Sequence, residues 1–311
     1  MRVFYSGKGD QPNTRYLYHD CMPNRLVSIH GKYFRYSRDW LASCADLPAW
    51  SSREVMVDSG AFSAFMEGHP ITLEEVTRAY DVFATRFSNK FKHLWFINLD
   101  VIPGAGPGIR PTEDEIARAL DKSDDNLVFL QRRFGDVILP VFHRLESWER
   151  LEVIKSQAKF FCAAPGQQVG EAVRVEWAKR VLAQCKGWKV HGLAATSERI
   201  MVEVDWYSVD SASWARMGGF GIIYTATSGR LRSVYISAQS PRRNQIDMHY
   251  DTLPAMAQRA IRDEFESMGY TLDGMREKYL DRMVYNIKKL EHFLQTTPRR
   301  DTGIQGALFN P

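Results

Sequence analysis

The sequence predicts an α/β protein that folds as a (β/α)8 TIM-like barrel, with a late β-hairpin and a C-terminal helical segment. Short β-rich runs alternate with helical stretches over the first two-thirds of the chain, and about eight such runs can be counted, the strand number of this barrel. Polar side chains recur where the runs end, as at the mouth of a barrel enzyme. The chain has 311 residues, 44% of them hydrophobic, so it can bury the core of one large barrel.

The expected barrel strands are runs of β-branched and aromatic residues. In chain order they cover residues 3–6, 26–30, 55–58, 94–100, 137–142, 159–163, 189–192 and 207–210. Helices are expected between them. The clearest cover residues 72–86 and 112–120, because each opens with a capping-box pattern, Thr72 with Glu75 and Thr112 with Glu115.

The alternation stops after Asp210. Residues 218–227 and 231–237 are β-rich runs on either side of Ser228-Gly229-Arg230, which predicts a hairpin. Residues 253–268 and 272–294 carry apolar side chains at helical spacing, which is typical of packed helices. We therefore expect a barrel with its hairpin over residues 1–240, helices packed on the barrel over 241–295 and a flexible tail over 296–311.

Composition narrows the class of protein. No apolar run approaches the roughly 18 residues of a membrane span, and the first residues enter a strand instead of a signal-peptide core. We expect a cytoplasmic protein without membrane contact, in the host cytoplasm if a phage encodes it. The four cysteines are too scattered for a zinc site and are expected to be free thiols; they are Cys21, Cys44, Cys162 and Cys185.

Two segments carry the candidate chemistry. Residues 54–63 and 207–214 each run β-branched or aromatic residues into an aspartate, Asp58 and Asp210, and small residues follow. This pattern is typical of a strand that delivers a carboxylate to a barrel mouth. Asp-Ser-Gly is also a common turn and helix-cap sequence, so each motif alone has a purely structural interpretation. Two carboxylates over one cavity suit chemistry at a glycosidic carbon, where one attacks and the other handles the proton.

Both motifs resemble those of the tRNA-guanine transglycosylase superfamily. Residues 57–62, Val-Asp-Ser-Gly-Ala-Phe, are similar to its Asp-Ser-Gly-Gly-Phe signature, and residues 210–214, Asp-Ser-Ala-Ser-Trp, are similar to the Asp-Ser-Ala-Ser-Tyr stretch of its archaeosine branch. The zinc site of the tRNA enzymes is absent, because no cysteine follows Cys185. With its short length and His143 in place of a glutamine, the chain is most similar to the phage and bacterial DNA-guanine transglycosylases of the DpdA type.

The resemblance implies an enzyme that replaces guanine in DNA with a free 7-deazaguanine base, of the 7-cyano-7-deazaguanine type, without a cofactor or metal. Asp210 would attack the anomeric carbon, and Asp58 would transfer protons at the bases. Asp205 is a rival nucleophile; Asp210 is preferred because the Ser-Ala-Ser-aromatic sequence follows it. The implied substrate contacts are Ser59, Phe62, Asp100, His143, Ala163, Ala164, His191 and Gly192.

Some of these contacts have specific implied roles. Asp100 would accept hydrogen bonds from the guanine amino group and ring N–H. His143 and the backbone N–H groups of Ala163 and Ala164 would address the carbonyl side, and Phe62 and His191 would stack on the ring. Structural roles remain open: Asp100 could cap a turn, His143 could be structural, and Phe62 could belong to the core.

Basic pairs after Asp210 make DNA a plausible partner. The net charge is only +4, but arginines cluster at Arg230, Arg232, Arg242 and Arg243, where they would contact the phosphate backbone. A transglycosylase acting on tRNA is the nearest alternative. A non-catalytic nucleic-acid-binding barrel would keep the arginines but would not need both aspartates. A phosphate-binding aldolase or isomerase would need a lysine at a strand end as nucleophile or base, and no expected strand ends in lysine.

The tail carries one further motif. Gln305, Leu308 and Phe309 resemble the Gln-x-x-Leu-Phe peptide by which replication and repair proteins dock on sliding clamps. Such a peptide lays two apolar anchors into a groove at the cost of ordering only a few residues. The alternative is a tail that packs its Leu-Phe pair on the barrel.

Overall fold

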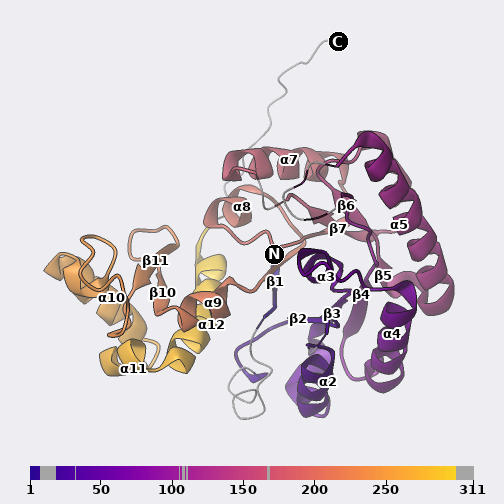
Figure 1. Ribbon diagram of the computed structural model, residues 1–311. Helices are drawn as coiled ribbons and strands as arrows, with labels where there is room; N and C mark the ends of the chain where they lie inside the picture. The colour runs from indigo at the N-terminus through magenta and orange to yellow at the C-terminus, as the bar shows by residue number, and fades with distance from the viewer. Residues whose placement is uncertain are drawn as a thin grey trace, which may run out of the picture.

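A parallel sheet that curls into a barrel dominates the computed structural model, which describes residues 1–7, 19–31, 33–104, 106, 109, 111–166 and 169–298 (Figure 1). All pairs between neighbouring strands in this nine-stranded sheet are parallel. The strands are β1 (Arg2–Tyr5), β2 (Arg25–Ser28), β3 (Glu54–Asp58), β4 (His93–Ile97), β5 (Ile138–Leu139), β6 (Val141–His143), β7 (Phe160–Ala164), β8 (Lys189–Gly192) and β9 (Ser208–Ser211).

Pro140 interrupts one strand of the barrel and divides it into two short strands, β5 and β6. β5 and β6 lie directly before and after Pro140, and they are the two ends of the strand order β5-β4-β3-β2-β1-β9-β8-β7-β6. Proline has no N–H to donate, so it interrupts the ladder. Its carbonyl still accepts the N–H of Cys162 at 2.8 Å, while the Leu139 carbonyl accepts that of Asn98 at 2.9 Å. The interrupted strand, β5 with β6, therefore bonds to β4 on one side and to β7 on the other. The predicted TIM-like barrel is confirmed.

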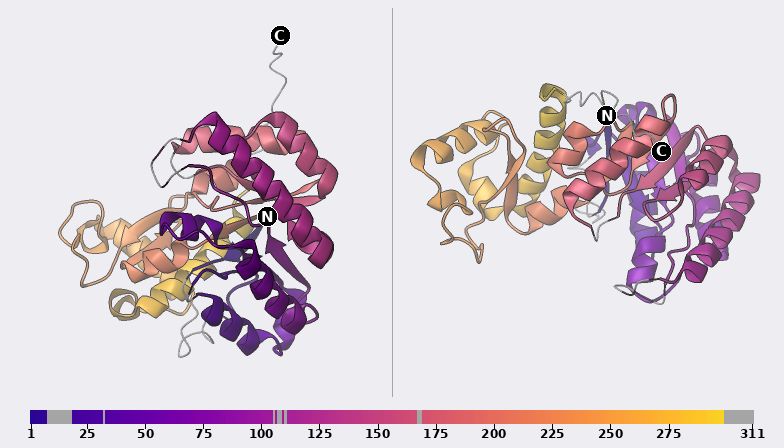
Figure 2. Two further views of the ribbon diagram at one scale, coloured as in Figure 1. Left: turned by 45° about the vertical axis from the view of Figure 1, so that its right-hand side comes forward. Right: turned by 90° about the horizontal axis from the view of Figure 1, so that it is seen from above.

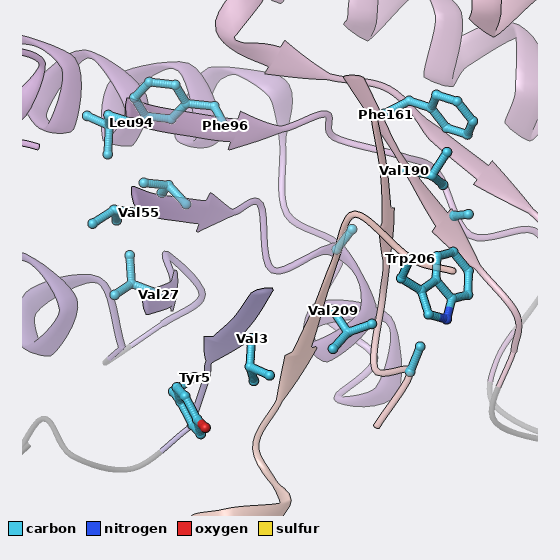
Figure 3. Packing of buried hydrophobic residues seen from close by; sticks show 14 of the residues in the cluster. Val3, Tyr5, Val27, Val55, Leu94, Phe96, Phe161, Val190, Trp206 and Val209 are labelled. Carbon is cyan, nitrogen blue, oxygen red and sulfur yellow. The ribbon is translucent and has the colours of Figure 1, made fainter. Parts of the chain in front are cut away.

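Strand side chains alternate between the inside and the outside of the barrel. One buried cluster fills the inside; its members are Phe4, Leu26, Met56, Ile97, Leu139, Val141, Phe160 and Cys162. Strand residues of the opposite parity belong to the larger cluster between strands and helices, part of which is drawn in Figure 3; they include Val3, Tyr5, Val27, Val55, Phe96, Phe161, Val190 and Val209. Asp58 shares the inward parity of Met56, so it faces the barrel axis at the carboxyl end of β3.

A polar cluster closes the inside of the barrel at the amino ends of the strands. Arg2 forms an ion pair with Glu54, and the indole Nε1 of Trp95 donates to Glu54 Oε2 at 3.0 Å. The Arg2 guanidinium also lies over the ring of Tyr207, 4.8 Å from its centroid. Only the carboxyl ends of the strands are thus left for a site.

The helices that follow the strands cover the outside of the barrel. They are α2 (Tyr33–Cys44), α3 (Ala61–Met66), α4 (Leu73–Phe87), α5 (Glu113–Phe134), α6 (Trp148–Gln157), α7 (Glu171–Gln184), α8 (Glu198–Glu203) and α9 (Ser213–Gly219), with short 3-10 turns η1 (Pro48–Ser52) and η2 (Gly135–Val137). Both predicted capping boxes are present, at Thr72 and Thr112. The second helix is much longer than the predicted 112–120, because its amphipathic pattern continues to Phe134.

A smaller lobe lies beside the barrel (Figure 2). It contains the predicted hairpin, β10 (Ile222–Thr225) paired antiparallel with β11 (Arg232–Tyr235), then η3 (Tyr250–Thr252), α10 (Ala255–Glu266), α11 (Leu272–Glu277) and α12 (Tyr279–Thr296). The lobe has its own buried cluster, made of Ile223, Val234, Ile236, Tyr250, Ile261, Phe265, Met275 and Tyr285. The hairpin therefore packs with the C-terminal helices, while Met283, Ile287 and Leu290 of α12 belong to the larger cluster of the barrel, so that α12 joins the lobe to the barrel.

The helix predicted over 272–294 is divided at Lys278. The Nη1 group of Arg282 donates to the carbonyls of Met275 at 2.8 Å and Arg276 at 3.2 Å, which are the groups that a continuous helix would have used itself. Its Nε donates to Gly218 in α9 at 2.8 Å. Arg282 thus stabilises the break and ties the lobe to the barrel.

The four cysteines are free thiols, as predicted. No helix in the described part of the chain is both long and apolar enough to span a bilayer. The proposed clamp peptide with Gln305, Leu308 and Phe309 lies outside the described residues.

Candidate active site

Five of the expected site residues lie where strands end. Asp58 and His143 are the last residues of β3 and β6. His191 and Asp210 are the second-to-last residues of β8 and β9, and Asp100 follows β4. Parallel strands in a closed barrel bring all such ends to one mouth. The fold thus gathers side chains from across residues 58–210.

A glycine turn fixes Asp58. Gly60 has a φ of 77°, in the left-handed region, and its N–H donates to Asp58 Oδ2 at 3.1 Å. A Cβ at this position would lie 2.5 Å from the Cβ of His30, so no larger residue fits. Ser59 is fully buried beside this turn, whereas Phe62 on α3 is 54% exposed and is not a core residue.

The electrostatics of the mouth centre on Asp58. Burial raises its pKa from 3.8 to about 7, and the charges of Asp100 and then Asp210 add to the rise. The pKa of the Cys162 thiol, on the inner face of β7, is raised by burial and by the same three carboxylates. The three aspartates therefore lie close enough to couple. With a pKa near 7, Asp58 can hold or release a proton at neutral pH, as a general acid–base group must.

Asp210 has one oxygen held and the other largely unoccupied. Its Oδ1 accepts the backbone N–H of Ala194 at 2.7 Å and lies 3.5 Å from His191 Nε2. Its Oδ2 has a single long contact, from the Ser6 hydroxyl at 3.5 Å. The side chain is 13% exposed. This arrangement leaves Oδ2 as the oxygen available for attack on an electrophile.

Asp205, the alternative nucleophile, lies at the opposite end of β9 from Asp210. Asp205 is exposed and precedes β9, whereas Asp210 lies near its carboxyl end. A strand of this length spans more than about 10 Å. Asp205 therefore stands on the closed side of the barrel, away from Asp58 and Asp100.

The ring of His191 is enclosed beside Asp210 and is not free to stack on a base. Its ring is fully buried, with Nδ1 bonded to the Ser208 hydroxyl at 2.9 Å and Nε2 directed at Asp210. The ring packs nearly perpendicular to that of Phe4, with 5.5 Å between the ring centroids. A ring enclosed in this way presents no face to a ligand, so the stacking role expected for His191 is wrong.

His143 and Asp100 form a pair at the mouth. His143 Nε2 lies 2.8 Å from Asp100 Oδ2, and the two side chains are 35% and 16% exposed. Burial lowers the pKa of His143, but the hydrogen bond and charge of Asp100 outweigh it, and the net shift is upward. The backbone N–H of His143 donates to Glu146 Oε2 at 3.2 Å. Both expected base-binding residues are thus accessible, and each orients the other.

The backbone positions expected to bind the base differ in access. Ala163 is fully buried and paired on both sides, opposite Phe142 and Gly192, so the expected contact at Ala163 is wrong. Gly192 is also buried, and a Cβ there would lie 2.9 Å from both Ala195 and Trp206; its smallness serves packing. Ala164, the last residue of β7, is partly exposed and remains at the mouth.

The four arginines lie on or beside the hairpin of the small lobe. Arg230 forms an ion pair with Glu198 at 2.9 Å, which ties the hairpin turn to the start of α8, and Arg243 lies 3.4 Å from Asp251. Arg242 lies over the Tyr235 ring and donates to Gln245. Arg232 is exposed on β11. Arg232 and Arg242 therefore present the more available positive charge.

Sequence reasoning missed three contacts of this site. They are the Ser6 hydroxyl, the Ala194 N–H, and Arg174, whose guanidinium donates to the Ala194 carbonyl at 2.9 Å. A backbone donor leaves no residue-type signal, and Arg174 sits on a helix far from any strand end. Within the described ranges, no three His, Cys, Asp or Glu side chains gather as a metal ion would require.

No protein-family model matches the chain, and no curated protein is similar enough in sequence to match it.

Proposed function

We propose that the protein is a base-exchanging transglycosylase that replaces guanine in DNA with a 7-deazaguanine of the 7-cyano type. The observation that carries the proposal is the raised pKa of Asp58, which burial, and then the charges of Asp100 and Asp210, bring to about 7. One carboxylate is thereby kept ionisable near neutral pH beside a second whose Oδ2 is available to attack. Glycosyl transfer with retained configuration needs such a pair.

In the first half-reaction, Asp210 Oδ2 bonds to C1′ of the target nucleotide while the bond from C1′ to N9 breaks. The bonding electrons leave with guanine, and Asp58 in its protonated form supplies the proton that makes guanine a neutral leaving group. Oδ1 stays bonded to Ala194, which orients the carboxylate. Asp58 ends this step as a carboxylate.

In the second half-reaction, Asp58 takes the N9 proton of the incoming 7-deazaguanine. N9 then attacks C1′, and the ester bond to Asp210 breaks. Two inversions restore the original configuration, and the protons balance, so no external energy source is needed. Asp100 accepts hydrogen bonds from the amino edge of either base, with His143 at its side.

The target base must leave the stack before this chemistry, because a barrel mouth cannot reach a glycosidic bond inside a duplex. Arg232 and Arg242 supply positive charge for the phosphate backbone. DNA is favoured over tRNA because the cysteines of the zinc site of the tRNA enzymes are missing, since no cysteine follows Cys185.

The test is base exchange with radiolabelled guanine on duplex DNA, single-stranded DNA and tRNA, followed by nucleoside analysis. We expect label in deoxyguanosine, and we expect a covalent protein–DNA adduct that Asp210→Asn abolishes. Asp205→Asn is the matched control and should exchange normally. Label only in tRNA would show that the substrate is RNA and not DNA. Retained exchange in Asp210→Asn would refute the assignment of Asp210 as the nucleophile.

A further inference from the structure

One backbone N–H in an uncommon conformation holds the carboxylate of Asp210. Ala194 has a φ of 51°, in the left-handed region that non-glycine residues avoid because Cβ approaches the carbonyl oxygen. In this conformation its two polar groups serve different partners. The N–H donates to Asp210 Oδ1 at 2.7 Å, and the carbonyl accepts from Arg174.

Arg174 reaches this carbonyl from a neighbouring unit of the barrel. It belongs to the first turns of α7, which follows β7, whereas Ala194 follows β8. Its Nη2 donates to the Ala194 oxygen at 2.9 Å, a charge-assisted bond stronger than one between neutral groups. Its Nε is buried and has no hydrogen-bond partner among the described residues. The guanidinium therefore lies at the Ala194 carbonyl although its Nε is left without a hydrogen bond.

The other side of the loop is fixed by packing. Gly192 lies against Ala195 and Trp206 so closely that a Cβ would not fit, and Ala195 is fully buried. Ala194 therefore lies between a rigid inner wall and the guanidinium of Arg174. Strained backbone of this kind persists only where its surroundings enforce it.

We propose that Arg174 is a positioning residue for the nucleophile. It holds Ala194 in the left-handed conformation, which keeps the Ala194 N–H on Oδ1 of Asp210 and leaves Oδ2 directed at the substrate. The consequence for catalysis rests on the proposed function. The consequence for the loop does not, and the two can be measured separately.

The decisive variant is Arg174→Met, which keeps the apolar stem and removes the donors. Arg180→Met is the matched control, since Arg180 lies on the same helix with its guanidinium over the Trp148 ring. In Arg174→Met we expect the single-turnover rate of covalent-adduct formation to fall about tenfold, as for the loss of one charge-assisted hydrogen bond, with the KM values for DNA and free base little changed. Arg180→Met should match the wild type.

Rescue separates positioning from stability. Adding Ala194→Gly to Arg174→Met should restore part of the rate, because glycine adopts positive φ without steric strain. Amide hydrogen exchange gives a readout independent of chemistry. The amide of residue 194 should exchange faster in Arg174→Met than in the wild type or Arg180→Met, in protein without any substrate.

Each outcome decides a different point. An unchanged adduct rate together with a protected residue-194 amide in Arg174→Met would overturn the proposal. A slower rate that Ala194→Gly does not improve, accompanied by a lower melting temperature, would also overturn it and assign Arg174 to stability alone. A wild-type protein that exchanges no base, while the residue-194 amide loses protection in Arg174→Met, would refute the proposed function and leave the positioning role standing.

Discussion

Replacing Asp58 by asparagine should remove catalysis and, at neutral and higher pH, stabilise the fold. The pKa of Asp58 is raised by burial and by two neighbouring carboxylates, so its ionised form is unfavourable in the folded protein. Asparagine keeps the shape and the hydrogen bond from Gly60 but carries no charge. Stability and activity should therefore move in opposite directions in Asp58→Asn.

The magnitude follows from proton linkage. In the unfolded chain the carboxyl loses its proton near pH 3.8, whereas in the folded chain it keeps the proton until about pH 7. Between these values the folded state binds more protons, so the contribution of Asp58 to stability falls as pH rises through this window. A difference of about three pKa units corresponds to about 4 kcal/mol. The variant should gain up to that amount over the wild type at pH 8 and almost nothing at pH 4.

Urea unfolding of wild type and Asp58→Asn at pH 4.5, 6 and 8 tests this directly. The difference in unfolding free energy should grow steadily across the three values. Asp125→Asn, an exposed carboxylate on α5, is the control and should show no such trend. If the two proteins keep the same difference at every pH, Asp58 does not have a raised pKa, and the proton-transfer role assigned to it fails with it.

Three further predictions concern the turn, the lobe and the tail. Gly60→Ala should destabilise the fold by at least about 2 kcal/mol, against about 1 kcal/mol for Gly68→Ala, which has the same sign of φ but no close neighbour; equal melting temperatures would refute the steric argument. Arg232→Ala and Arg242→Ala should each lower the slope of log affinity for DNA against log salt by about 1, and an unchanged slope would remove them from the interface. Deleting residues 305–311 should abolish pull-down of a sliding clamp and spare base exchange on short oligonucleotides; unfolding of the truncated protein would show instead that the tail packs on the barrel.

The barrel could be predicted because its signals are local. Each strand is a short β-rich run, and the capping boxes at Thr72 and Thr112 mark the helix starts. The position of Asp58 and Asp210 follows from the same signals, since strand ends of a parallel barrel share one mouth. The division at Lys278 could not be predicted, because it depends on where the Arg282 side chain reaches in the folded protein.

The carboxylates of the site could be predicted from the sequence, whereas the residues that surround them could be predicted less well. His191 and Ala163 stand near strand ends, yet both are fully buried. Ala163 belongs to the cluster between strands and helices, and the His191 ring is enclosed inside the barrel beside Phe4, Ser208 and Asp210. The packing of the hairpin is hard to predict for a related reason. Which lobe Ile223 and Val234 pack into depends on partners far along the chain.

The polar cluster of Arg2, Glu54 and Trp95 has a consequence for the kinetics of the proposed reaction. It seals the barrel at the amino ends of the strands, and the apolar layer above it fills the interior. The departing base and the incoming base must therefore pass through the same entrance. In the proposed reaction the first must diffuse away before the second arrives, so double-reciprocal plots should give the parallel lines of a ping-pong enzyme, with free guanine competing against the incoming base.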